Sequence, residues 1–127
     1  MDHYATLARP VAAVFADLAT PARLCDWLAE VVQVSTDSAA IIGVGTALSL
    51  TVLEGGTVRV VDGDVIGYEP PWLVAYRIFL PQPRVLRLTC TASEGATRIH
   101  VHQSDDPAPL TVDLTQLTEP TSQPTLP

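Results

Sequence analysis

Apolar side chains recur at two different spacings along this chain, and the first is helical. Between residues 10 and 29 they return every three or four positions, the pattern of one buried helix face. Thr20-Pro21 interrupts the pattern and predicts a second start, with Thr as N-cap and Pro in the first turn. We therefore expect two short helices. Their buried positions are Val11, Val14, Phe15 and Leu18 in the first, and Leu24, Trp27 and Leu28 in the second.

The second spacing is two, which predicts β-strands. The expected strands are 2–8, 31–34, 46–53, 57–68, 72–80, 85–92 and 97–103. Polar turns separate them, with one predicted at 35–38 and hairpins at 54–56 and 93–96, and Gly63 predicts a bulge or bend inside the longest strand. Strands joined by hairpins, with the helices set apart, are typical of an α+β domain with a curved antiparallel sheet of about seven strands.

The C-terminal segment from residue 105 differs in composition, with five Pro and five Thr among its 23 residues. Its apolar positions fit a helix (Leu110, Leu114, Leu117) and a strand (Leu110, Val112, Leu114) equally well. Pro109 and Pro120 limit any helix between them to ~10 residues, or ~15 Å. We expect a main domain over residues 1–104, followed by a Pro/Thr-rich segment over 105–127 that ends in an extended tail.

The amino-acid composition argues against several classes of function. The net charge of −7, with seven Arg as the only basic side chains besides His, argues against nucleic-acid binding, which depends on cations neutralising phosphates. No apolar run approaches the ~18 residues of a membrane-spanning helix, and the N-terminus lacks a signal-peptide pattern, so a cytoplasmic location is expected. The 47% apolar content and mean hydropathy of +0.27 exceed what solubility requires. Something apolar is therefore enclosed or covered.

Five short sequence segments, taken in their order along the chain, resemble the helix-grip superfamily, also called START/Bet v 1-like or SRPBCC. The resemblance is to its polyketide cyclase/dehydratases in particular. The segments are 10–18, Thr20-Pro21-Ala22-Arg23-Leu24 before Trp27-Leu28, Gly45-Thr46, 63–71 before Tyr76-Arg77, and Ala96-Thr97-Arg98. The likeness spans about residues 3–104. It implies a seven-stranded sheet around a long C-terminal helix, with a hydrophobic ligand in the gap between them and no cofactor.

This chain departs from the family in its closing helix, which Pro109 and Pro120 restrict to about half the usual length. We expect the concave face of the sheet to be covered in another way. Either a second subunit covers part of it, as a homodimer, or residues 110–127 lie across it as an extended segment.

The candidate ligand-binding residues are those placed where the family's cavity lies: Phe15, Trp27, Leu48, Leu50, Val74, Tyr76, Ile78, Leu88, Ile99 and Val101. Trp27 either walls the cavity mouth or simply packs a helix on the sheet. Tyr76 shares a face with Trp72, Val74 and Ile78, which carries its hydroxyl into an apolar space. It is the candidate catalytic residue, polarising a substrate carbonyl, unless its tip reaches water at the sheet edge.

Other polar motifs indicate no metal site. His100 and His102 share one strand face, and with Asp105 or His3 they could bind a metal, but Ile99 and Val101 mark the opposite face as the core side. The two histidines are expected in solvent beside Arg98. Asp62-Gly63-Asp64 is interpreted as two solvated carboxylates at a bend. Gly43-Val44-Gly45 lacks the third glycine and the helix of a dinucleotide site. Arg59, Arg77 and Arg87 lie on predicted strands, where an inward-facing Arg could hold an enolate or carboxylate. Arg77 and Arg87 lie opposite the apolar faces by alternation, which favours outward salt bridges.

The resemblance implies a protein of bacterial secondary metabolism that binds a bulky hydrophobic molecule. It favours an enzyme that cyclises, dehydrates or rearranges a polyketide-like substrate by confining it. One alternative is a non-catalytic carrier of hydrophobic ligands. Another is a protein-interaction module, which would have a filled interior and an exposed apolar patch.

Overall fold

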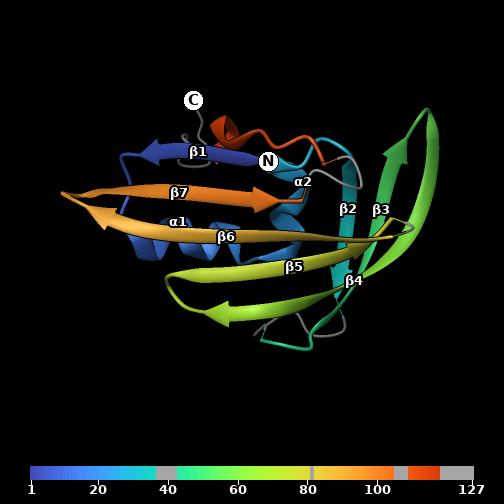
Figure 1. Cartoon of the computed structure of the whole chain (residues 1–127), viewed down its shortest axis with the longest axis horizontal. Coiled ribbons are helices and arrows are strands. Elements are labelled where there is room, and N and C mark those ends of the chain that lie inside the picture. The colour runs from blue at the N-terminus through green and yellow to red at the C-terminus, as the bar shows by residue number, and fades with distance from the viewer. Residues whose placement is uncertain (37–42, 81, 105–108, 118–127) are drawn as a thin grey trace, which may run out of the picture.

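Seven antiparallel strands form one curved sheet in the order β1-β7-β6-β5-β4-β3-β2 within the residues that the structure describes (Figure 1). This computed structural model describes residues 1–36, 43–80, 82–104 and 109–117. The strands are β1 (Asp2–Leu7), β2 (Val31–Thr36), β3 (Ala47–Glu54), β4 (Thr57–Glu69), β5 (Leu73–Phe79), β6 (Pro83–Ser93) and β7 (Ala96–Gln103). The α+β architecture predicted from the sequence is confirmed.

Two short helices connect β1 to β2, as predicted. They are α1 (Val11–Leu18) and α2 (Leu24–Trp27), the second preceded by a 3₁₀ turn at Pro21–Arg23. Thr20, however, makes no capping bond to α2. Its hydroxyl donates to the Ala16 carbonyl at 2.6 Å. Thr20 therefore bonds a carbonyl near the end of α1 and does not bond an amide in the first turn of the next helix.

Two strand details differ from the sequence prediction. Ser35 and Thr36 pair with β3, so β2 continues into the turn that was predicted at 35–38; residues 37 and 38 lie outside the described part. Trp72 precedes β5 and is 50% exposed, so it does not share the buried face of Val74 and Tyr76.

The irregularity expected at Gly63 lies two residues later. The β4–β5 register shifts between Val65 and Gly67, whereas Gly63 itself pairs regularly with Ile78. A Cβ at Gly63 would stand 2.7 Å from the Arg77 carbonyl oxygen and 2.9 Å from Leu50 Cδ1. The glycine is therefore explained by close packing, and the bend belongs to its neighbours.

The C-terminal strap, which we define as residues 109–117, ends in a 3₁₀ turn at Leu114–Leu117. Leu110, Leu114 and Leu117 are buried in the hydrophobic core that the sheet shares with both helices. The strap therefore combines the two patterns in its sequence, with one β-bridge (Leu28 to Val112) followed by a helical turn. Among the described residues, no helix is long and apolar enough to cross a membrane.

Candidate functional site

The ten predicted ligand-binding residues gather in one hydrophobic core on the concave side of the sheet. Each is at most 4% exposed, and seven of the ten are 0% exposed. A side chain with no exposed surface has no water-sized space beside it, whether open or enclosed, so the core is filled around these residues. The structure thus brings the predicted residues together, and a ligand among them would have to displace part of the packing.

Tyr76, the candidate catalytic residue, points its hydroxyl at the end of α1. The hydroxyl donates a 2.6 Å hydrogen bond to the carbonyl of Leu18, and both residues are fully buried. Burial, with a smaller contribution from Tyr68, raises the pKa of Tyr76 well above its ordinary value. The phenol is therefore neutral at any physiological pH, and it can act as a hydrogen-bond donor to a carbonyl oxygen.

Trp27 is buried with its polar atom unpaired. Its side chain is 1% exposed, and its Nε1 has no hydrogen-bond partner among the described residues. A buried donor without an acceptor costs about 1–3 kcal/mol, and such groups are rare in native proteins. An acceptor oxygen placed beside the indole would remove that cost.

The strap is joined directly to the Trp27 segment by main-chain hydrogen bonds. The Asp113 amide donates to the Trp27 carbonyl at 2.8 Å, and the Ala29 amide donates to the Thr111 carbonyl at 3.0 Å. The Glu30 carboxylate accepts from the Thr111 amide and hydroxyl. The strap therefore lies against α2 and the residues that follow it.

A buried glutamine anchors the start of the strap to β7. Gln103 donates from Nε2 to the Leu110 carbonyl and accepts at Oε1 from the Leu110 amide, both at 2.9 Å. The far end is held by Arg9, which donates to the Leu117 carbonyl at 3.1 Å. The Arg9 anchor joins residues 108 positions apart, a contact that no local sequence pattern predicts.

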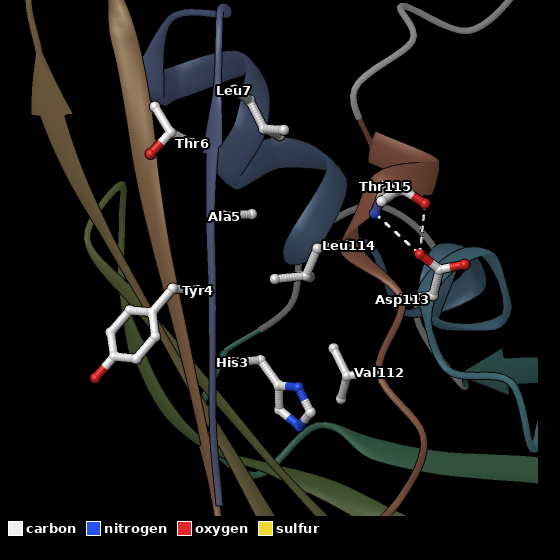
Figure 2. Close-up of a pocket in the computed structure, with 9 residues that line it drawn as sticks. All are labelled: His3, Tyr4, Ala5, Thr6, Leu7, Val112, Asp113, Leu114 and Thr115. Carbon is white, nitrogen blue, oxygen red and sulfur yellow. Dashed lines mark hydrogen bonds between the residues drawn. The ribbon is translucent and has the colours of Figure 1, made fainter.

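An open groove of about 390 Å³ separates the strap from β1 (Figure 2). His3, Ala5 and Leu7 point from one face of β1 toward the strap, whereas Tyr4 and Thr6 point away. Val112 and Leu114 project from the other side. This groove was not predicted from the sequence, although the alternation of residues 3, 5 and 7 is a signal for its β1 wall. A second hollow of about 380 Å³, lined by 25–29 and Asp113, lies beside Trp27.

The charged residues of the sheet face outward, as expected, but several have unforeseen partners. Arg77 forms a two-pronged ion pair with Asp64 at 2.9 and 2.6 Å, which raises the Arg77 pKa. The expectation that Asp64 is merely solvated is therefore wrong. Arg59 pairs with Glu54 at 3.0 Å, and Arg87 is exposed.

The histidine pair faces away from the core but has a different partner from those considered. His100 and His102 both bond Asp2, while His3 points into the groove on the other face of β1. Asp105, the other residue considered, lies outside the described part.

No family model matches the sequence, and no curated protein matches it. Solved structures match its shape. Ara h 8.0201 superposes with a TM-score of 0.63 at 18% identity, over 86% of this chain and 80% of that one. The Zhui aromatase/cyclase from Streptomyces sp. R1128 gives 0.65 at 17% identity, over 81% and 64%. A START superfamily protein from Mycobacterium smegmatis gives 0.64 at 11% identity, over 90% and 77%. At these identities the likeness shows a shared fold, and it confirms the helix-grip architecture.

Proposed function

From the helix-grip fold that this chain shares with an aromatase/cyclase and a START superfamily protein, we propose that it binds a bulky hydrophobic small molecule. The ligand lies between the concave face of the sheet and the C-terminal strap, lined by the ten residues named from the sequence. It is a polyketide-like compound that the protein cyclises, dehydrates or rearranges.

The unpaired indole N–H of Trp27 is the observation that supports this proposal most directly. The Trp27 ring lies in the apolar core, whereas the hollow of about 380 Å³ beside it is lined by 25–29 and Asp113 and so includes two carboxylates, those of Asp26 and Asp113. An apolar core with one unpaired donor is suited to a molecule that is mostly hydrophobic and carries a carbonyl oxygen. Ketone groups give polyketide-like compounds that combination.

Ligand entry among these residues requires the strap to move, because seven of the ten have no exposed surface and only Trp27 borders the hollow lined by 25–29 and Asp113. The three strap leucines, Leu110, Leu114 and Leu117, occupy the core where the resemblance places a ligand and a long helix. Grooves flank the strap on both sides, toward β1 and toward Trp27. Displacing these three side chains is therefore the simplest way to open an apolar cavity without disturbing the sheet.

The proposed chemistry needs confinement and one or two donors. An intramolecular aldol condensation joins an α-carbon to a carbonyl carbon and releases one water, so it requires no oxidant, reductant or cofactor. Holding the chain in a reactive conformer lowers the barrier by several kcal/mol. Tyr76 would exchange the Leu18 carbonyl for a substrate carbonyl as the acceptor of its hydroxyl, and it would thereby polarise the carbon under attack.

Tryptophan fluorescence tests the binding step. The chain has two Trp residues, so Trp72→Phe leaves Trp27 as the single reporter while removing only an exposed ring. Titrating this variant with emodin, a polycyclic aromatic ketone, should give a saturable change in Trp27 emission with one molecule per chain. Trp27→Phe, assayed by calorimetry, should weaken emodin binding about tenfold, because it keeps a ring and removes the donor.

A non-saturable change in emission, or equal emodin affinity in Trp27→Phe and the parent, would contradict the proposed site. Tyr76→Phe distinguishes catalysis from binding. On a linear poly-β-ketone thioester, this variant should lose turnover and retain emodin affinity. Stoichiometric binding without any product in the parent would instead identify a carrier.

A second candidate, a protein-interaction module, is favoured by two observations. The interior is filled, and the outer face of the β3–β4 hairpin carries an apolar patch of Leu53, Val58 and Val60, the last two 62% and 70% exposed. Leu53 and Val58 are register partners, so the patch is continuous. A homodimer through this face would appear by light scattering on size-exclusion chromatography. Val58→Lys with Val60→Lys would make it monomeric, whereas a monomeric parent would contradict this candidate.

A further inference from the structure

Three metal-ligating side chains meet on the outer face of the sheet, away from the proposed ligand site. The pairing of β1 with β7 sets Asp2 opposite His102 and Tyr4 opposite His100. Because alternate residues of a strand share a face, Asp2, His100 and His102 project on the same side. One ligand atom from each, the Oδ1 of Asp2 and one nitrogen from each ring, lies within 4.8 Å of the other two.

The geometry of this cluster is convergent. A single oxygen, Asp2 Oδ1, is 2.7 Å from His100 Nε2 and 2.8 Å from His102 Nδ1. Two imidazole nitrogens aimed at one carboxylate oxygen define a common point, whereas independent surface ion pairs would not. The Tyr4 ring stacks on His100 with a centroid separation of 4.6 Å and an interplanar angle of 5°, which fixes the orientation of that imidazole.

The exposure of the cluster and the charge of the chain also suit a cation. The Asp2 side chain is 45% exposed, so an ion can reach its carboxylate from solvent. The net charge of the chain is −7, which attracts cations from a distance. Arg87, the register partner of His102 on β6, and Arg98, two residues before His100, oppose this attraction locally.

We propose that Asp2, His100 and His102 form a binding site for a divalent transition-metal ion of the Zn²⁺ class. Two imidazole nitrogens and one carboxylate oxygen are a ligand set that Zn²⁺ accepts, at ~2.0–2.2 Å from each atom, with the remaining position open to water. In a tetrahedral site, ligand atoms at that distance from the ion are ~3.3–3.6 Å apart, which is more than the 2.7 and 2.8 Å of the present hydrogen bonds. The exposed His102 side chain can supply this adjustment by rotation.

Metal binding would replace the hydrogen bonds that Asp2 makes with His100 and His102, so the protons in those bonds must be accounted for. Each ring nitrogen that now bonds Asp2 must present a lone pair to the ion, and any proton on it passes to the solvent. The affinity for the metal should therefore fall as the pH is lowered. The ion would also join β1 to β7, and because it binds the folded state it should raise the melting temperature.

Calorimetric titration of the full chain with ZnCl₂, and with CoCl₂ followed by visible absorption, tests the site. One ion per chain is expected, with Co²⁺ d–d bands characteristic of nitrogen and oxygen ligands. His102→Ala and the near-isosteric Asp2→Asn should each weaken binding by at least about tenfold. His3→Ala is the matched control, because this third histidine points to the opposite face of β1. Arg87→Gln should tighten binding, since it removes a nearby positive charge.

Absence of heat and of Co²⁺ bands at millimolar metal would overturn the proposal. So would binding that survives both His102→Ala and Asp2→Asn, or that His3→Ala abolishes. Far-UV circular dichroism on each variant separates loss of a ligand from loss of the fold. These results are independent of emodin binding, so the metal site and the proposed function stand or fall separately.

Discussion

The hydroxyl of Tyr76 on β5 donates a 2.6 Å hydrogen bond to the backbone carbonyl of Leu18, the last residue of α1. The final carbonyls of a helix have no partner within it, so the phenol caps α1 from the floor of the sheet. Both residues have no exposed surface. This one bond links α1 to the sheet across the region where the resemblance places a ligand. Without a ligand, Tyr76 therefore has a structural role.

Tyr76→Phe should lower the free energy of unfolding by about 1–3 kcal/mol, because it leaves the buried Leu18 carbonyl without a donor. Urea denaturation followed by circular dichroism measures this change. Tyr68→Phe is the matched control; Tyr68 is only half-buried and packs its ring near Phe15, so its loss should cost about 0.5 kcal/mol or less. Equal midpoints for Tyr76→Phe and the parent would show that the Leu18 carbonyl finds another partner.

Gln103→Leu should release the strap. Leucine has a similar size but cannot bond the Leu110 amide and carbonyl, and each buried group left unpaired costs about 1–3 kcal/mol. Hydrogen exchange should show faster exchange of the Leu110 and Asp113 amides, while the centre of the sheet is unchanged. If the strap covers the ligand site, emodin should also bind faster.

Thr111→Val serves as the comparison for that experiment, because it removes only an exposed hydroxyl bond to Glu30. Its effect on stability should be within about 0.5 kcal/mol. Slow exchange at Leu110 in Gln103→Leu would mean that the buried strap leucines, not the glutamine, hold the strap in place.

The helices and strands could be predicted because each depends on a short repeating pattern. The stripe of Val14, Phe15 and Leu18 determines the buried face of α1, and alternation determines which residues of β5 and β7 face the core. The ten candidate site residues were placed in one cluster for the same reason. Whether that cluster encloses a cavity was not predictable, because free space depends on how α1, α2 and the strap pack together.

The pairing of strands that are distant in the sequence was the other feature that could not be predicted. Asp2 meets His100 and His102 only because β1 pairs with β7 across about a hundred residues of sequence, and no local pattern specifies that alignment. The strap was ambiguous because Leu114 belongs to both the helical and the strand pattern. The structure uses both, with a bridge at Val112 and a 3₁₀ turn from Leu114 onward. Gln103, which anchors this segment, carries no signal of its own in the sequence.

Acid should remove the stabilisation that Asp2 supplies. Hydrogen bonds from His102 and His100 lower its carboxyl pKa from 3.8 to about 2, so the ionised form favours the folded state. This contribution is complete above about pH 4 and is lost as the pH falls toward 2. The difference in melting temperature between the parent and Asp2→Asn, measured with a chelator present, should be positive at about pH 5 and vanish near pH 2. A difference that does not change with pH would contradict this assignment.

Gly63→Ala should destabilise the fold through a steric clash at the β4–β5 pairing. The added Cβ would stand 2.7 Å from the Arg77 carbonyl oxygen, which belongs to the backbone of the neighbouring strand and cannot rotate away. Overpacking of this kind costs about 1–3 kcal/mol, more than the gain from replacing a flexible glycine. Gly43→Ala is the control, since a Cβ there meets nothing within 4 Å. Urea unfolding should therefore rank Gly63→Ala clearly below Gly43→Ala, and equal stability of the two variants would show that β4 and β5 can separate at this point without loss.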